Sequence, residues 1–218
     1  MAGPGGGPRS GARRSKSSGR WLREHFADPF VRRARAEGAR SRALFKLEQI
    51  DAREHLLAAG MTVVDLGAAP GAWSQYARGR VGAAGRVIAS DILPMQPLAG
   101  VRFLEGDLRD PAVLAALREA IGESPVDLVL SDMAPNLSGV DAIDAPRVME
   151  LAELALQLAE ETLKPAGSTL IKVLQGAGFD QLVGSARHRF RRVRFVKPAA
   201  SRARSPETYL LASGKRMV

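Results

Sequence analysis

The 218-residue chain contains no cysteine. Without thiols it can form no disulfide framework, no cysteine-bound zinc ribbon and no thiol nucleophile. Its histidines, His25, His55 and His188, are scattered, so we expect no metal site. No window approaches the roughly 20 consecutive apolar residues of a membrane span, and the amino terminus lacks the apolar segment of a secretory signal. These absences predict a soluble, cytoplasmic protein without a membrane partner.

Acidic residues are also scarce relative to basic ones, with 23 Asp and Glu against 32 Lys and Arg and a formal net charge of +9. The basic residues gather in two regions, 1–50 and 187–204. Such a charge attracts polyanions, so nucleic acid is the leading partner. The alternative is a basic surface that only keeps the protein soluble.

The start of the chain differs in composition from the rest. Residues 1–20 are mostly Gly, Ser, Pro and Arg with almost nothing to bury, which predicts a disordered basic tail. A mitochondrial presequence would share this composition, but the glycines and prolines disfavour the amphipathic helix that import needs. We expect residues 21–218 to form a single domain with an N-terminal helical extension. In that extension Ser41 would cap a helix with apolar positions Leu44, Leu47 and Ile50.

After Gly60, short β-rich runs alternate with helical segments. This alternation predicts a parallel sheet with helices on both faces. Only residues 197–206 separate the last two expected strands, so that pair should be antiparallel. The expected strands are 62–66, 86–90, 101–104, 126–131, 168–174, 192–196 and 207–212, and the expected helices are 72–79, 111–121, 146–163 and 178–188.

A glycine loop follows the first expected strand, in the order Val63-Val64-Asp65-Leu66-Gly67-Ala68-Ala69-Pro70-Gly71-Ala72-Trp73. A strand, glycine loop and helix start let the backbone approach a nucleotide-like ligand closely. The loop lacks Gly-Lys-Ser/Thr, and Ala69 replaces the second glycine of the dinucleotide fingerprint. Asp65 precedes the glycines instead, which suits a cationic, amino-bearing ligand better than a pyrophosphate.

Two more acids follow the next two expected strands. Asp91 ends the second strand, where a carboxylate can accept both hydroxyls of a ribose, and Asp107 follows the third. A single such Asp is most often a cap or turn residue. Three of them beside a glycine loop, at the edge where doubly wound sheets bind ligands, indicate an adenosine-bearing cofactor.

The loop from Asp65 to Gly71 resembles the S-adenosylmethionine loop of class I methyltransferases, and with Trp73-Ser74-Gln75 it is similar to the FtsJ/RrmJ type, ribosomal RNA large-subunit ribose 2′-O-methyltransferases. The resemblance implies a Rossmann-like α/β fold with a seven-stranded, mostly parallel sheet whose last strand is antiparallel. It implies that the cofactor is S-adenosylmethionine. The implied cofactor residues are Asp65, Gly67 and Gly71 in the loop, Trp73 nearby, Asp91 at the ribose, Asp107 at the adenine, and Asp132. Ala72 stands where the family usually has a second glycine.

Lys172 lies within the apolar run Thr-Leu-Ile-Lys-Val-Leu-Gln-Gly, residues 169–176. An unpaired ammonium in a buried strand would cost several kcal/mol, so Lys172 either reaches solvent along its stem or has a buried partner. Asp132 follows the fourth expected strand, beside the fifth, and could be that partner. The sequence after Ser131, Asp-Met-Ala-Pro, has no aromatic residue to stack a flipped base, which speaks against methylation of an exocyclic amine.

The resemblance carries over a catalytic tetrad of Lys46, Asp132, Lys172 and Glu207, all present here. Methyl transfer to a ribose oxygen requires the hydroxyl to be positioned and relieved of its proton. A second cation such as Lys46 would favour neutral Lys172, whereas Asp132 and Glu207 would favour its ammonium form. Whether Lys172 removes the proton or, still charged, orients the hydroxyl is therefore left open.

The likeness extends from about Trp21 to the end of the chain and includes Ser201-Arg202-Ala203-Arg204-Ser205. It implies a uridine 2′-hydroxyl of 23S rRNA, in the A loop of the assembled large subunit, as the substrate of a monomeric enzyme. Two alternatives remain. One is a nicotinamide-dependent dehydrogenase, disfavoured by the missing middle glycine. The other is a non-catalytic RNA-binding or ribosome-assembly factor, disfavoured by the intact tetrad.

Overall fold

The computed structural model describes residues 28–135, 141–201 and 205–216. The expected tail at 1–20 and the middle of the Ser201–Ser205 motif lie outside these residues. Within the described part of the chain, no helix is long and apolar enough to cross a membrane.

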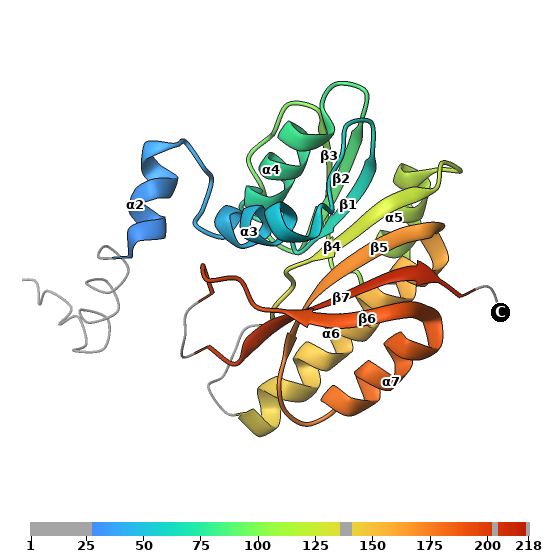
Figure 1. The fold of residues 1–218 in the computed structure, drawn as a ribbon. Helices are drawn as coiled ribbons and strands as arrows, with labels where there is room; N and C mark the ends of the chain where they lie inside the picture. Colours follow the sequence, from blue (N-terminus) through green and yellow to red (C-terminus); the bar gives the residue numbers. More distant parts are fainter. Residues whose placement is uncertain (1–27, 136–140, 202–204, 217–218) are drawn as a thin grey trace, which may run out of the picture.

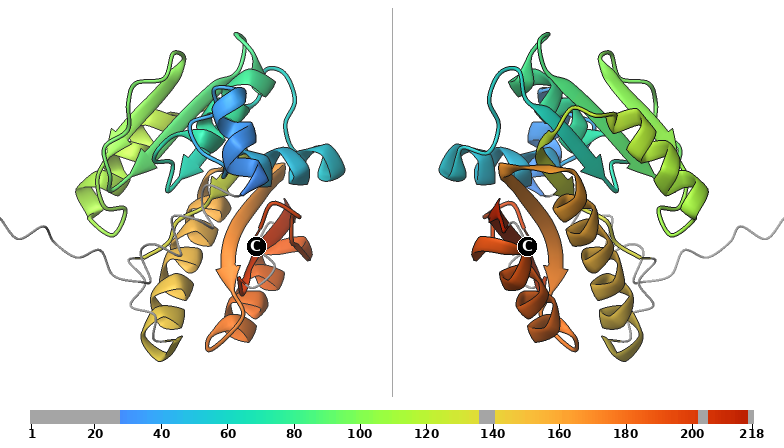
Figure 2. Two further views of the ribbon diagram at one scale, coloured as in Figure 1. Left: turned by 90° about the vertical axis from the view of Figure 1, so that its left-hand side faces the viewer. Right: turned by 90° about the vertical axis from the view of Figure 1, so that its right-hand side faces the viewer.

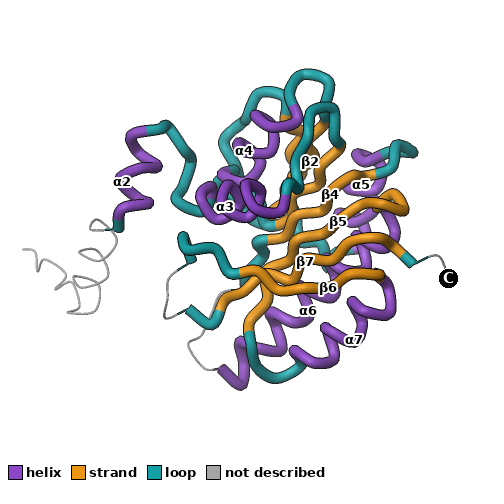
Figure 3. The backbone as a smooth tube through the Cα atoms, viewed as in Figure 1, coloured by secondary structure: helices purple, strands orange, loops and turns teal. Residues whose placement is uncertain are grey.

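Seven strands form one sheet in the order β3-β2-β1-β4-β5-β7-β6 (Figures 1 and 3). The strands are β1 (Thr62–Leu66), β2 (Arg86–Asp91), β3 (Val101–Glu105), β4 (Val126–Ser131), β5 (Leu163–Leu174), β6 (Phe190–Val196) and β7 (Glu207–Lys215). The first five strands pair in parallel, and β7 runs antiparallel to both β5 and β6. This confirms the mostly parallel sheet with a reversed last strand and the β4–β5 pairing.

Helices cover both faces of the sheet. The helices after β1 are α4 (Ala72–Val81), α5 (Pro111–Ile121), α6 (Asp141–Thr162) and α7 (Phe179–Arg189). One apolar core lies between the sheet and α5, α6 and α7, with residues such as Leu117, Leu156 and Ala186. A second core lies on the opposite face with α4, around Trp73 and Tyr209. In Figure 2, α6 and α7 lie side by side along the same face.

Two helices precede the sheet, α2 (Pro29–Ala36) and α3 (Leu44–Glu54). The side chain of Asp28 caps α2 by accepting a hydrogen bond from the amide of Phe30. Phe30 packs against Phe45 of α3, with ring centroids 5.8 Å apart. Ser41 does not cap α3, because its Oγ accepts from the amide of Ala43, one residue before the helix begins.

The expected boundaries differ most at β5. The sequence predicts a strand from residue 168, but β5 begins at Leu163, which pairs with Val126. The register then shifts, because Ser168 pairs with Leu128 only two positions further along β4. The residues between Leu163 and Ser168 include Pro165 and Gly167, which are uncommon inside strands. The sequence pattern therefore gave no indication of a strand before residue 168.

Candidate active site

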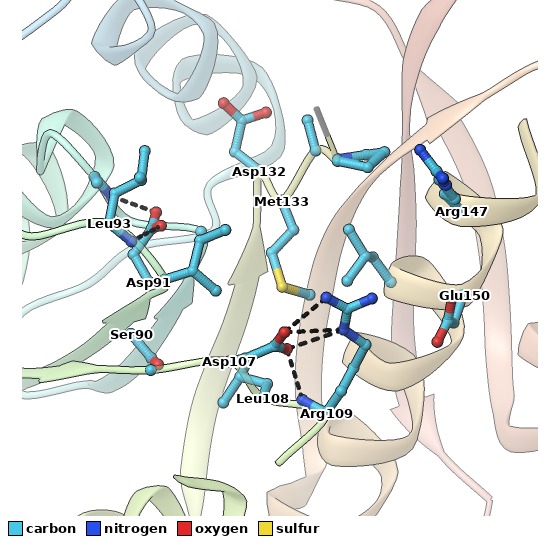
Figure 4. A pocket seen from close by; sticks show the side chains of 17 residues that line it. Ser90, Asp91, Leu93, Asp107, Leu108, Arg109, Asp132, Met133, Arg147 and Glu150 are labelled. Atoms are coloured by element: carbon cyan, nitrogen blue, oxygen red, sulfur yellow. Dashed lines mark hydrogen bonds and ion pairs between the residues drawn. The ribbon is translucent and has the colours of Figure 1, made fainter. Parts of the chain in front are cut away.

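A cavity of about 490 Å³ opens at the carboxyl ends of the parallel strands (Figure 4). This is the edge at which doubly wound sheets bind ligands. Four of the residues expected to bind the cofactor line it: Gly67, Asp91, Asp107 and Asp132. The sequence reasoning did not single out the others, which include Ser90, Ile92, Leu93, Arg109, Met133, Arg147 and Glu150.

Gly67 brings the loop after β1 against the segment after β4. Its φ is +73°, and a Cβ atom there would lie 2.7 Å from both Cα and N of Met133. The amide of Asp132 also donates to the carbonyl of Leu66 at 3.0 Å. No side chain fits at residue 67 in this arrangement, which explains why glycine is needed at this place in the loop.

The carboxylate of Asp91 is fixed by backbone amides. Its Oδ2 accepts from Ala69 at 2.8 Å, and its Oδ1 accepts from Leu93 at 2.9 Å (Figure 4). Each carboxylate oxygen has a lone pair for a further donor, so the carboxylate can still accept hydrogen bonds from two neighbouring hydroxyl groups. Ile92 and Leu93 beside it are 57% and 59% exposed and supply apolar surface at the cavity.

Asp107 is already engaged in an ion pair. The Arg109 amide donates to its Oδ1 at 2.9 Å, and the Arg109 guanidinium donates to both carboxylate oxygens at 2.6 to 3.1 Å (Figure 4). The guanidinium lowers the pKa of Asp107. A ligand amino group at Asp107 would therefore compete with Arg109.

Asp65 lies behind the cavity and does not line it. Its side chain is fully buried, its Oδ2 accepts from Ser74 Oγ at 2.6 Å, and its Oδ1 has no partner among the described residues. Burial raises the pKa of Asp65 to about 7, with Asp132 and Asp91 adding to the increase and Ser74 opposing it. A direct contact between Asp65 and a cofactor stays a prediction.

Lys172 is paired with Asp132, whose side chain is 19% exposed at the cavity. Its Nζ lies 2.5 Å from the carbonyl oxygen of Asp132 and 3.2 Å from Asp132 Oδ1. Its side chain is only 11% exposed, so it does not reach out to bulk solvent. The pairing of β4 with β5 brings these two residues together.

The other two residues of the expected tetrad form a second ion pair. Lys46 of α3 donates to Glu207 Oε1 at 2.6 Å, and Ser201 Oγ lies 3.2 Å from the same oxygen. Burial disfavours the charged form of Glu207, but Lys46, Lys172 and Tyr209 outweigh it and lower the pKa of Glu207. Glu207 is therefore ionised at neutral pH.

Tyr209 joins the two ion pairs. Its hydroxyl oxygen lies 3.0 Å from Asp132 Oδ1 and 3.0 Å from Glu207 Oε1. Tyr209 stands directly opposite Lys172 in the β5–β7 ladder and is fully buried. Burial, together with the two carboxylates, raises its pKa well above the ordinary value and keeps the phenol protonated. The tetrad is thus one network that includes a residue the sequence did not single out.

The indole of Trp73 supports this network without lining the cavity. Its Nε1 donates to the carbonyl of Ala43 at 2.8 Å, and its ring lies 5.6 Å from the ring of Tyr209, centroid to centroid. Trp73 is buried in the core between the sheet and α4. The expected contact with a cofactor stays a prediction.

Arg40 holds the outer side of the glycine loop that follows β1. Its guanidinium donates to the carbonyls of Pro70, Gln96 and Pro97 at 3.1, 2.6 and 2.6 Å. Gly71 does not line the cavity, but a Cβ atom there would lie 2.9 Å from this guanidinium. Gly71 therefore allows the loop to pass close to Arg40, a role that the glycine's position in the motif alone did not reveal.

Sequence patterns carried little signal for the residues that were missed. A tyrosine inside an apolar strand is typical of a core position, so Tyr209 gave no sign of a polar role. Arg109 follows Asp107 by two positions, and this spacing could have indicated the ion pair. Among the described residues, no group of three or more His, Cys, Asp or Glu side chains is arranged to hold a metal ion.

The sheet order, the reversed seventh strand and the cavity at the carboxyl edge define a Rossmann-like methyltransferase. The family model of FtsJ-like methyltransferases matches residues 39–215, and the chain belongs to that family. This membership removes the dehydrogenase alternative.

Curated relatives and solved structures agree with the family. The chain is 60% identical over 204 residues to "Ribosomal RNA large subunit methyltransferase E" of Xanthomonas oryzae pv. oryzae, covering 94% of this chain and 97% of the relative. It is also 60% identical to the protein of that name from Xanthomonas campestris pv. campestris, with 93% and 97% covered. A Plasmodium falciparum structure described as a ribosomal RNA methyltransferase superimposes with a TM-score of 0.71 at 26% identity, covering 81% of this chain and 98% of that one.

Proposed function

We propose that this protein transfers a methyl group from S-adenosylmethionine to the 2′-hydroxyl of a uridine in large-subunit ribosomal RNA. The proposal follows the names of the relatives and the resemblance of the motifs. The observation that carries it is the network of Lys46, Asp132, Lys172 and Glu207, which meets the cofactor cavity at Asp132.

The residues of the cavity fit an adenosine-bearing cation. Asp91 is fixed with free lone pairs for a ribose, and Asp107 is placed to accept from an adenine amino group once Arg109 gives way. The Oγ of Ser90 is buried at the cavity without a hydrogen-bond partner in the described structure, so a polar ligand atom can satisfy it. S-adenosylmethionine, when bound, would supply an electrophilic methyl group on a sulfonium.

The task left to the protein is to present a ribose oxygen and to manage its proton. An ammonium has three N–H donors, and the carbonyl and Oδ1 of Asp132 can accept two from Lys172. The third can hold the substrate oxygen and stabilise negative charge as the hydroxyl gives its proton to solvent water, the oxygen–methyl bond forms and the sulfonium–methyl bond breaks. The Nζ of Lys172 lies 3.2 Å from the carboxylate of Asp132, and Lys172 also interacts electrostatically with the ionised Glu207. We therefore favour Lys172 as an orienting cation over Lys172 as a base.

Lys46 can act on the substrate from the α3 side of the network. It reaches Glu207 from α3, on the opposite side of the network from Lys172, and its side chain is 15% exposed. A cation there can contact the phosphate or sugar of an entering nucleotide. The expected substrate, an A-loop uridine of 23S rRNA within the assembled large subunit, follows from the resemblance, as does a monomeric state. The expected cytoplasmic location follows from the composition of the chain.

The test compares two lysine variants of the same strand. Lys172→Ala should abolish transfer of labelled methyl to large-subunit particles while the affinity for S-adenosylmethionine stays within a few-fold. Lys164→Ala is the matched control, because Lys164 also lies on β5 but pairs with Asp127, away from the network. Substantial turnover by Lys172→Ala would overturn its assigned role. A wild-type protein that binds particles but transfers no methyl would support the assembly-factor alternative.

A further inference from the structure

A second pocket lies at the other end of the same strands. It has a volume of about 400 Å³, and its lining includes Arg78, Arg86 and Arg102. Arg86 begins β2 and Arg102 lies near the start of β3, whereas the cofactor cavity adjoins the ends of these strands. Strands of five or six residues rise about 3.3 Å per residue, so the two sites lie roughly 15–20 Å apart.

The pocket carries positive charge without a counterion among its lining residues. The remaining lining residues are glycines and apolar strand residues, namely Gly85, Val87, Ile88, Gly100 and Val101. None of the three arginines forms an ion pair within the described structure, although many other arginines of the protein do, including Arg80, Arg109, Arg118, Arg189 and Arg194. An external anion is the partner that these charges lack.

Two of the guanidinium groups are held in place by backbone carbonyls. Nη1 of Arg78 donates to Gly82 and Gly85, and Nη2 of Arg86 donates to Ala120 and Ile121, the last residues of α5. These contacts use one nitrogen of each group and leave the others for a ligand. Fixed guanidinium groups lose less conformational entropy when they bind an anion.

A glycine lets the backbone close the pocket against one of these groups. Gly100 has φ of +74°, and a Cβ atom there would overlap Nε of Arg78. A larger residue at position 100 would therefore displace the guanidinium. Arg102 completes the set from β3, and no described residue accepts a hydrogen bond from its side chain.

We propose that this pocket binds a phosphate group of the substrate RNA backbone, outside the target nucleotide. Guanidinium groups pair with phosphate oxygens in a bidentate fork, so a pocket lined by three of them favours a phosphate over a neutral ligand. The net charge of +9 draws a polyanion to the protein from all sides. That the phosphate belongs to RNA rests on the proposed function, whereas the inference that the pocket binds a phosphate rests on the pocket alone.

The experiment uses the full-length protein and large-subunit particles. Arg102→Ala should weaken particle binding about 3- to 10-fold in low salt and reduce the slope of log affinity against log salt by about 0.7–0.9, the loss of one phosphate contact. KM for particles should rise more than kcat falls. Arg118→Ala is the matched control: it removes the same charge from an exposed arginine that pairs with Glu161 outside the pocket. Arg102→Lys should restore part of the binding.

Titration with inorganic phosphate and pyrophosphate separates the sources of the ligand. Weakened particle binding by Arg102→Ala, beyond that of Arg118→Ala, supports the RNA phosphate. Weakened binding of the free phosphates with unchanged particle binding overturns the RNA source and identifies a small-molecule site. Equal behaviour of Arg102→Ala and Arg118→Ala in all titrations overturns the pocket as a site. These results can be distinguished from a failure of the proposed function. If the proposed function were wrong, the wild-type protein would bind particles without methylating them.

Discussion

The hydroxyl of Tyr209 lies 3.0 Å from Oδ1 of Asp132, although the two residues are 77 positions apart in the sequence. The same hydroxyl is 3.0 Å from Glu207 Oε1. A phenol has one proton to donate, so the two carboxylates share a single donor. The position of Asp132, and through it that of Lys172, therefore depends on the hydroxyl of Tyr209.

Removing this hydroxyl should slow methyl transfer and leave the fold intact. Tyr209→Phe keeps the ring against Trp73 but loses a hydrogen bond to a charged group, typically worth about 1.5–3 kcal/mol. We expect kcat to fall about 10- to 100-fold, with cofactor affinity within a few-fold of wild type. Tyr76→Phe is the control, since Tyr76 donates to Asp51 away from the network. Unchanged kcat in Tyr209→Phe would show that the ion pairs hold their geometry unaided.

The buried carboxyl of Asp65 predicts a pH-dependent stability. Its pKa rises from 3.8 to about 7 on folding, so between these values the native state binds more protons than the unfolded state. Stability linked to Asp65 is complete below pH 3.8 and is lost as pH rises through 7. Asp65→Asn cannot ionise. The urea midpoint of the variant should therefore rise relative to that of the wild type between pH 5 and pH 8. A difference between the two midpoints that does not change with pH would contradict the raised pKa.

Arg109 should compete with the cofactor for Asp107. The pair is about half exposed, and exposed ion pairs contribute about 0–1 kcal/mol, so the competition is mild. We expect Arg109→Ala to tighten binding of S-adenosylhomocysteine by up to about 5-fold in low salt. The gain should fade in high salt, where the ion pair of the wild type is screened. Calorimetry measures both, and weaker binding by the variant would mean that Arg109 assists the ligand.

Two glycine-to-alanine changes should have opposite effects. Gly67→Ala places a methyl group 2.7 Å from the backbone of Met133 at a φ of +73°, so it should destabilise the protein by more than about 1 kcal/mol and reduce cofactor binding. Gly79 lies inside α4, and a Cβ atom there would meet open space, so Gly79→Ala should stabilise the protein by up to about 1 kcal/mol. Thermal unfolding with and without S-adenosylhomocysteine measures both effects. A neutral Gly67→Ala would contradict the close packing of the loop.

The strands were predictable because their apolar runs are short and separated by turn residues or amphipathic helices. The β4–β5 pairing, and with it the meeting of Lys172 and Asp132, followed from the expected topology. The hydrophobic pattern could not predict that β7 lies between β5 and β6. The pattern indicates only that β6 and β7 pair antiparallel, and β7 could equally have paired with β6 at the edge of the sheet. The observed position of β7 places Tyr209 opposite Lys172.

Side-chain geometry accounts for the other features that could not be predicted from the sequence. Gly67 lines the cavity, whereas Gly71 does not and lies against the Arg40 guanidinium. The motif alone could not distinguish these two glycines. Asp65 and Asp91 precede and follow the loop with similar sequence context. Asp65 is buried and accepts a hydrogen bond from Ser74, whereas Asp91 lies at the cavity and accepts hydrogen bonds from backbone amides. Such differences arise from packing and are not encoded in residue type or spacing.

The place of β7 in the sheet also determines when the network around Lys172 can be completed. Lys46 and Glu207 are 161 positions apart, and β6 has no partner until β7 lies beside it. Contacts of such separation form after local structure, because their loop-closure entropy must be overcome first. A growing chain that has already folded the cavity at the carboxyl edge therefore still lacks Glu207 and Tyr209, because no residue of β7 lines that cavity. Insertion of one strand completes both the sheet and the network that joins Lys46, Glu207, Tyr209, Asp132 and Lys172.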